Sequence, residues 1–137
     1  MTRQRRAPQR RRELRNDCGA AAVEFVLVGL LLTTLFLGLL QLGLNLHIRN
    51  VLIASVSEGA RYGANADRVP EDGAAYARTL IRSALSDRFA TDVTAGVGVA
   101  DGAEVVVVTV RAPLPLMALL GPAGSLRVSG HALREGQ

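Results

Sequence analysis

An uncharged run of 22 residues, from Phe25 to Leu46, constrains this chain more than any other feature. As a helix, the run would measure roughly 33 Å, which is enough to cross a hydrocarbon core about 30 Å thick. A removable secretory signal has a shorter apolar region, of about 7–15 residues, and a small-residue cleavage site after it. The segment Gln41–Asn45 is not such a site. The sequence therefore predicts a transmembrane helix over residues 20–46 that stays with the protein.

Arginines crowd the segment before this run. Residues 1–19 hold seven arginines and two acids, a net charge of +5, whereas residues 20–137 hold nine arginines and ten acids, a net charge of −1. The pI near 10.5 is therefore a property of this leader and does not indicate a nucleic-acid partner. Positive residues that flank a span tend to remain in the cytoplasm, although a basic arm that touches anionic lipid is compatible with the same placement. We expect a single-pass protein of the cytoplasmic (inner) membrane, with its N-terminus inside and its C-terminus outside.

One carboxylate stands at the head of the apolar run. Glu24 follows Gly19 by five residues and directly precedes Phe25. An ionised group in hydrocarbon is costly unless it finds a partner, so Glu24 is a candidate functional residue. The alternative is a glutamate in the headgroup region, favoured by the dipole at the amino end of the helix. Gly19 is either an accessible, side-chain-free point in the chain or an ordinary glycine at the entry of the helix.

Residues 47–137 predict one extracytoplasmic α+β domain that begins with a continuation of the long helix. Small and apolar residues recur there at helical period: Leu52, Val56, Gly59, Ala60 and Gly63. The segment Asn65–Pro70 should break this helix, and Pro70 suits the first turn of the next one. That second helix would bury Ala77, Leu80, Ile81, Ala84 and Leu85 and turn Arg78, Arg82 and Asp87 outward.

From Val93 onward the apolar period changes to two, which is typical of strands. Val93, Ala95, Val97 and Val99 should face a core. Glu104–Ala112 is apolar on both faces and should be a central strand, and Leu114–Leu120 should form an apolar loop or short turn. A last strand would place Leu126, Val128, Gly130 and Ala132 on the core side. The expected fold is thus helices followed by a small antiparallel sheet.

Several blocks of this sequence, in this order, resemble the TadE-like pseudopilin family, the Tad/Flp branch of type IV pilin-like proteins. Gly19-Ala-Ala-Ala-Val-Glu24-Phe25 is similar to the family's cleavage and assembly signal. Arg49-Asn-Val-Leu52 and Ser57-Glu-Gly-Ala-Arg-Tyr-Gly-Ala64 are similar to its juxtamembrane signature, and residues 126–135 to its closing strand. The resemblance is dense in the first half of the chain and thin from Val69 to Leu120. It implies a pilin-like fold with one long helix, half in the membrane and half against the globular part.

The resemblance also implies how the chain would be processed. A membrane-embedded prepilin peptidase would cut between Gly19 and Ala20, and the new amine of Ala20 would be a cation. Glu24 of an incoming subunit would pair with the amine of a neighbour inside an apolar filament core, where burial strengthens the attraction. Phe25 is the next position of the signal or, equally, an ordinary apolar residue of the span. Cys18 is the only cysteine and precedes the cut, so no disulfide framework is expected.

Two further features allow two interpretations each. Gly29, Gly38 and Gly43 would let the span pack closely on other helices, or they reflect ordinary glycine usage in membrane helices. Glu58, Arg61 and Tyr62 lie within about one helical turn and would form a docking face for a partner pseudopilin or Tad assembly protein. Alternatively, they belong to a solvated helix surface with Tyr62 packed on the domain.

The sequence offers no arrangement for catalysis. His47 and His131 are the only histidines and have no neighbouring ligand in sequence, so we expect no metal. There is no lysine and no phosphate-binding glycine loop. We therefore expect no enzyme, no cofactor and no small-molecule substrate. The hypothesis is a minor pseudopilin of a Tad/Flp-type pilus or secretion apparatus used in adhesion, able to enter a surface pilus. The alternative is an uncleaved signal-anchored protein whose outer domain binds a ligand or envelope component.

Overall fold

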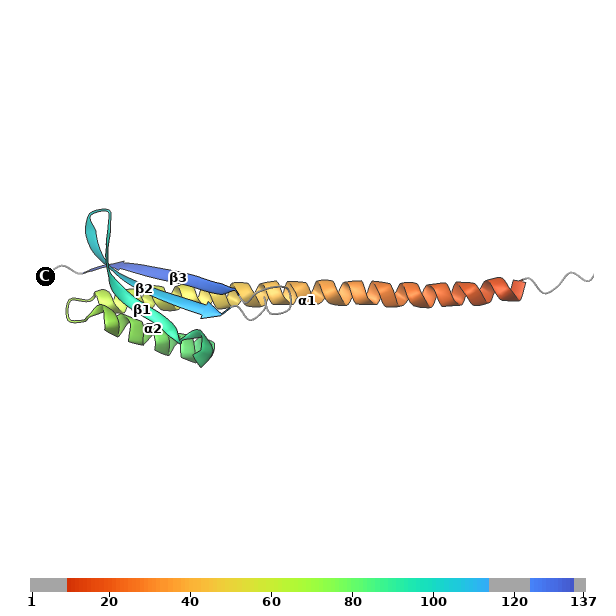
Figure 1. The fold of residues 1–137 in the computed structure, drawn as a ribbon, viewed down its shortest axis with the longest axis horizontal. Coiled ribbons are helices and arrows are strands. Elements are labelled where there is room, and N and C mark those ends of the chain that lie inside the picture. The colour runs from red at the N-terminus through yellow and green to blue at the C-terminus, as the bar shows by residue number, and fades with distance from the viewer. Residues whose placement is uncertain (1–9, 114–123, 135–137) are drawn as a thin grey trace, which may run out of the picture. The chain divides into compact units, whose positions relative to one another are not determined.

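The computed structural model describes the backbone of residues 10–113 and 124–134, and side chains from Gly19 onward. Its elements are α1 (Arg10–Ala64), α2 (Pro70–Ala84), the short 3₁₀ helix η1 (Asp87–Phe89), β1 (Asp92–Ala100), β2 (Ala103–Pro113) and β3 (Ser125–Leu133) (Figure 1). The predicted α+β class, with a long N-terminal helix followed by a helix and an antiparallel sheet, is confirmed. The predicted apolar loop at Leu114–Leu120 lies outside the described residues.

Contacts divide the chain into two units, Met1–Leu40 and Gln41–Gln137. In the first unit, α1 begins at Arg10, so Gly19 lies inside the helix and not at its entry. From Gly19 to Leu40 the apolar side chains are exposed. Thr33 and Thr34 each donate a hydrogen bond to the backbone carbonyl four residues earlier, at 2.8 Å. Because these two hydroxyl groups are satisfied within the helix, the surface around them is suited to hydrocarbon.

The helix is long and apolar enough from Gly19 onward to cross a membrane, and its most apolar window is not buried in the chain. A core helix of similar composition would be covered by its own protein. The predicted membrane-spanning character is thereby supported for the N-terminal part of α1.

The second unit is built on a three-stranded antiparallel sheet in the order β1-β2-β3, so the prediction of a central strand at Glu104–Ala112 is confirmed. The end of α1 and α2 contribute to a single apolar core with the sheet. Its largest fully buried side chains are Leu52, Val56, Ile81, Val93, Val106, Val108 and Val110. The core contains one aromatic ring, that of Phe89, and is otherwise aliphatic.

The predicted stripe on α1 is confirmed, because Leu52, Val56 and Ala60 are fully buried and Gly59 and Gly63 are buried beside them. The break after Ala64 is confirmed as well. The next helix starts at Pro70, and the Asp72 carboxylate accepts a hydrogen bond from the Val69 N–H at 3.2 Å. This contact satisfies a donor at the helix start that would otherwise have no partner.

The face predicted for α2 is correct in its centre and wrong at its end. Ala77 and Ile81 are buried, Leu80 and Leu85 are half-buried, and Ala84 is exposed. Arg82 and Asp87 are exposed as expected and form an ion pair at 3.2 Å. Arg78, expected to face outward, is half-buried and donates a hydrogen bond to the Val93 carbonyl. The last turn of the helix therefore lies at the rim of the core rather than over it.

The alternation of β1 also holds for only half of the strand. Val93 is buried and Ala95 half-buried, but Val97 is 52% exposed and Val99 is 78% exposed. The β1–β2 hairpin bends away from the helices toward a two-residue turn at Asp101 and Gly102 (Figure 1). Both turn residues have positive φ, 52° and 79°, as the favoured hairpin turn requires. The expectation that Val97 and Val99 face a core is wrong, because no helix covers that part of the sheet.

Candidate functional site

The sequence-predicted assembly site lies on an open helix surface. Gly19, Ala20, Glu24 and Phe25 all belong to α1, and all four are exposed, Phe25 by 79%. Residues four apart on a helix share a face and differ by about 6 Å along its axis. Ala20 and Glu24 are therefore neighbours on one side of α1, one turn apart.

Nothing in the described part of the chain satisfies the Glu24 carboxylate. The ion pairs there are Arg82–Asp87 and Arg134–Glu104, and no side-chain hydrogen bond involves Glu24. The side chains that follow it are apolar and exposed up to Leu32. A carboxylate at the edge of such a surface gains stability from a cation supplied by another molecule or by a new chain terminus, or from water at the membrane surface.

The fold of the chain does not require glycine at position 19. A Cβ built on Gly19 would meet no atom within 4 Å, and the same holds for Gly29, Gly38 and Gly43. Glycine inside a helix costs about 1 kcal/mol relative to alanine. These four glycines therefore lower helix stability without serving any contact among the described residues.

By contrast, the fold requires the two glycines of the segment Glu58–Ala64, which we call the Glu58–Ala64 block. A Cβ on Gly59 would lie 2.6 Å from the Gly73 carbonyl oxygen and 2.7 Å from the Cβ of Ala77. A Cβ on Gly63 would lie 3.2 Å from the Cα of Gly73. The missing side chains allow α1 and α2 to touch backbone to backbone. This block is thus a helix-packing motif of the domain itself.

The three residues predicted as a partner face do not act as a unit. Glu58 and Arg61 are exposed, and the described ion pairs do not join them. Tyr62 is half-buried and stacks on Tyr76 of α2, with ring centroids 4.5 Å apart and an interplanar angle of 19°. The Arg68 guanidinium covers the Tyr62 ring at 3.8 Å from its centroid and donates a hydrogen bond to the Tyr62 hydroxyl. Tyr62 is therefore packed on the domain, as the second interpretation predicted.

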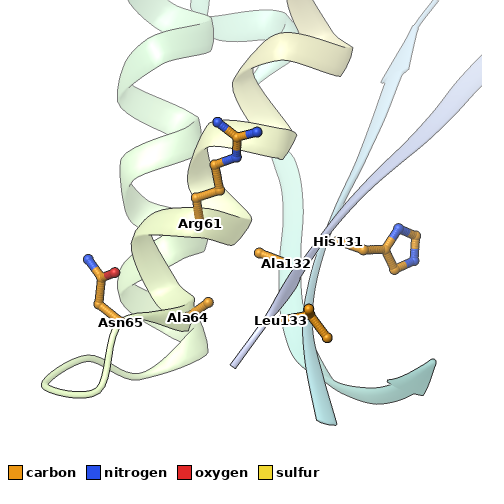
Figure 2. A pocket seen from close by; sticks show the side chains of 6 residues that line it. All are labelled: Arg61, Ala64, Asn65, His131, Ala132 and Leu133. Carbon is orange, nitrogen blue, oxygen red and sulfur yellow. The ribbon is translucent and has the colours of Figure 1, made fainter. Parts of the chain in front are cut away.

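A shallow pocket of about 390 Å³ lies beside Arg61, between the end of α1 and the end of β3. Its lining consists of Arg61, Ala64, Asn65, His131, Ala132 and Leu133. Figure 2 shows the His131 ring pointing away from α1, while the Arg61 side chain runs along its own helix. The polar groups do not converge on one point, so this pocket lacks the arrangement that fixes a small ligand.

Both histidines lie on exposed surface, His47 on α1 and His131 on β3. Within residues 19–113 and 124–134, no group of three or more metal-ligating side chains comes together. The structure therefore gives these two residues no shared role.

Sequence reasoning missed three structural features: the close backbone contact at Gly73, the one at Gly130, and the pairing of Arg111 with Arg127. Gly73 supplies the other half of the α1–α2 contact. Gly130 supplies the contact of β3 with α1, where a Cβ would lie 2.6 Å from backbone atoms of Val56 and Ser57. Arg111 and Arg127 stand directly opposite one another on β2 and β3. A glycine within an otherwise regular helix or strand pattern is the signal for close backbone approach, and it was available at positions 73 and 130.

Comparison with families of known proteins gives one match. Residues 19–61 match the family described as TadE-like protein. The match begins at the predicted cleavage glycine and ends inside the Glu58–Ala64 block, so it does not extend to the closing strand. Comparison with curated proteins and with solved structures gives no match. The match covers less than half of the chain and shows a likeness to this family in the apolar helix and the segment that follows it. The predicted resemblance of this chain to the TadE-like family is thereby confirmed over residues 19–61.

Proposed function

We propose that the chain is a minor pseudopilin that serves a Tad/Flp-type pilus or secretion apparatus. In this proposal, a prepilin peptidase cuts after Gly19 and the mature subunit begins at Ala20. The subunit is anchored in the inner membrane with its C-terminal domain outside, and it assembles with other pilins through its apolar helix. Its role is structural and non-enzymatic, in the service of adhesion or secretion.

One observation carries the proposal: an exposed carboxylate, which has no partner among the described residues, stands at the head of an exposed apolar helix surface. Glu24 and Phe25 are fully outside the core, as are the apolar side chains that follow. One face of the same helix becomes buried from Ile48 onward. No described residue outside α1 covers the apolar side chains between Phe25 and Leu40, and the lipid bilayer and a bundle of similar helices are two environments that would do so.

Cleavage would change the charge balance at the head of α1. The cut removes seven arginines and leaves a single amine at Ala20. That amine lies one turn from Glu24 of the same helix and is also available to Glu24 of a neighbour. A charge pair in low dielectric is favourable when matched and costly when one partner is missing. The pair therefore favours one axial offset between neighbouring helices and disfavours the others.

The first test is the N-terminus and intact mass of the membrane-extracted protein, from cells with and without a prepilin peptidase. We expect an N-terminus at Ala20 that depends on the peptidase. A chain that still begins near Met1 in both strains would overturn the proposal. It would leave the alternative, an uncleaved signal-anchored protein whose outer domain binds a ligand or envelope component.

The role of Glu24 is tested separately by Glu24→Ala. We expect this variant to be inserted, cleaved and folded, and to lose co-purification with other pilins. Glu71→Ala is the matched control, because it removes an exposed carboxylate from the first turn of α2. Equal assembly of Glu24→Ala and the unmodified chain would show that the carboxylate lies in the headgroup region and does not set the offset.

A further inference from the structure

The two ends of the C-terminal domain carry opposite charge, and the direction of its elements shows which residues belong to each end. Gly130 of β3 contacts the backbone of Val56 on α1, and the end of β3 lies beside Arg61 and Ala64. The strand and the end of α1 therefore run in the same direction (Figure 1).

This direction places the arginine pair of the sheet close to the end of the apolar run. Arg127 precedes Gly130 by three residues, or about 10 Å of strand. A distance of about 10 Å corresponds to six or seven residues of helix. Arg127, and Arg111 opposite it, are thus level with the α1 residues near Arg49. Arg49 itself comes three residues after Leu46, the last residue of the uncharged run.

The second helix returns to the same end. Gly73 packs on Gly63 and Ala77 packs on Gly59, so α2 runs opposite to α1. The last residues of α2 therefore lie at the same height along the domain as the start of the buried part of α1. Arg88, in η1, comes directly after α2 in the chain and lies at the same end. Arg49, Arg88, Arg111 and Arg127, all exposed, form a group that we call the basic rim.

The charges of the domain are sorted along this direction. The rim end holds five arginines (Arg49, Arg82, Arg88, Arg111, Arg127) and two acids (Asp87, Asp92), a net charge of +3. Among the described residues, the opposite end holds three arginines (Arg61, Arg68, Arg134) and six acids (Glu58, Asp67, Glu71, Asp72, Asp101, Glu104), a net charge of −3. Arg78, in the middle of α2, belongs to neither end. Asp87 is already paired with Arg82, so the four arginines of the rim share Asp92 as their acid.

The register of the sheet places like charges opposite each other at the rim. Arg111 lies directly opposite Arg127 on β3 and directly opposite Asp92 on β1. Like charges directly opposite each other on neighbouring strands are destabilising. Arginine binds phosphate through two parallel hydrogen bonds. A phosphate group between the two guanidinium groups would convert this repulsion into attraction.

We propose that the basic rim binds the headgroups of anionic phospholipids and holds the domain against the surface of the membrane that its own helix crosses. The lipid phosphates would lie at the level where the uncharged run ends, three residues before Arg49. The acidic opposite end would be repelled from the same surface, so the charge separation orients the domain. The inference rests on membrane insertion of the apolar run, as in the proposed function, but on neither cleavage nor pilus assembly.

The test uses the full chain, with Cys18→Ser, in vesicles of phosphatidylcholine with or without phosphatidylglycerol. A fluorophore on Ser125→Cys, at the start of β3, reports the rim end, and one on Asn65→Cys reports the far end. A lipid with a spin label on its headgroup quenches whichever fluorophore lies at the surface. We expect phosphatidylglycerol to increase quenching at position 125 but not at position 65, and salt to reverse the increase.

Charge variants then identify the residues responsible. Arg111→Gln with Arg127→Gln should lower the preference for the surface-bound state about fivefold for each arginine removed. Arg61→Gln with Arg134→Gln is the matched control, because it removes the same charge from the far end and should leave quenching at position 125 unchanged. Equal quenching with and without phosphatidylglycerol, or equal losses in the two double variants, would overturn the inference.

Three further outcomes distinguish failure of lipid binding from failure of membrane insertion and from failure of the proposed function. Energy transfer from copies labelled at position 125 to copies labelled at position 65, with no effect of phosphatidylglycerol, would mean that the rim binds the acidic end of a second copy and would overturn lipid binding. Loss of the chain from vesicles during alkaline extraction would overturn the span itself, and with it both proposals. A chain that is cleaved and assembled normally but shows no lipid effect would overturn this inference alone.

Discussion

Leu42 and Leu52 lie ten residues apart on the same helix, yet Leu42 is 57% exposed and Leu52 is completely buried. The glycines of the helix show the same contrast. Gly29 and Gly38 have nothing within 4 Å of a Cβ position, whereas Gly59 is in contact with the backbone of α2. Composition also differs between the two regions: residues 25–46 hold eleven leucines and no alanine, whereas residues 48–64 hold one leucine and three alanines. The difference is what covers the helix. After His47, other parts of the chain cover one face of α1; before His47, the apolar side chains are exposed and a cover has to come from the surroundings.

The contrast predicts opposite results for the same truncation at two positions. Leu52→Ala should lower the free energy of unfolding of the domain by about 2–5 kcal/mol, because it removes a fully buried side chain from a core with little room to collapse. Leu42→Ala should leave it nearly unchanged. The chain has no tryptophan, and its two tyrosines, Tyr62 and Tyr76, stack on each other. Tyrosine fluorescence in a denaturant titration of detergent-solubilised protein therefore reports the domain without interference from the apolar helix.

Equal denaturation midpoints for these two variants would break the comparison. That result would mean that the end of α1 is not held by the core in solution. The measurement also has an internal check, because a true core variant should shift the midpoint without changing the slope of the transition.

The second prediction uses glycine in place of leucine. Gly59→Ala places a methyl group 2.6 Å from the Gly73 carbonyl oxygen, so α1 and α2 must separate or tilt. Overpacking of this kind costs about 1–3 kcal/mol. Replacing glycine by alanine in a helix gains about 1 kcal/mol, so we expect a net loss of domain stability. Gly29→Ala is the matched control on the same helix and should cost the domain nothing. A Gly59→Ala domain as stable as the unmodified one would show that the helices have room to move apart.

The two regions were also predictable to different degrees. The stripe from Leu52 to Gly63 followed from its period, because a helix that packs on its own domain shows its buried face in the sequence. The alternation in β1 predicted burial for both Val93 and Val99, and the prediction was wrong for Val99. Alternation shows which face of a strand is apolar, but not how far the helices extend over that face. The predicted burial of Ala84 was wrong for the same reason, since periodicity does not show where the core ends.

The candidate site shows a different limit. The spacing of Gly19 and Glu24 identified it without any structure, and the structure of a single chain adds that both residues are exposed. In the proposed function their partners would belong to a peptidase, a lipid or a neighbouring subunit, and contacts within a single chain do not test that proposal. The Glu58–Ala64 block is the converse case, because packing within the domain accounts for its buried Gly59 and Gly63 and for the stacked Tyr62. A partner face at the exposed Glu58 and Arg61 stays a prediction.

A third, smaller effect tests that account of the signature block. Arg68→Gln removes the cation above the Tyr62 ring and the hydrogen bond to its hydroxyl. A partly exposed cation–π contact contributes about 0.5–1 kcal/mol, so the midpoint of the tyrosine transition should fall slightly. Arg88→Gln is a control that removes an exposed arginine with a longer contact, 4.7 Å from the centroid of the Phe89 ring. An unchanged midpoint for Arg68→Gln would mean that Tyr62 is held by Tyr76 alone.

The smallest effect on domain stability is expected for a substitution at Gly38. The same substitution distinguishes the two interpretations of the exposed glycines of the span, close helix packing or ordinary glycine usage. Gly38→Ala should not destabilise the domain, since no atom lies within 4 Å of the added methyl group, and it should favour the helix slightly. If the glycine serves close packing between spans, as small residues do in membranes, the same variant should weaken association of full-length chains in a bilayer. Energy transfer between donor- and acceptor-labelled copies measures that association. Unchanged transfer would show that Gly38 is ordinary glycine usage in a membrane helix, and that the apolar surface from Phe25 to Leu46 contacts lipid rather than a neighbouring span at this position.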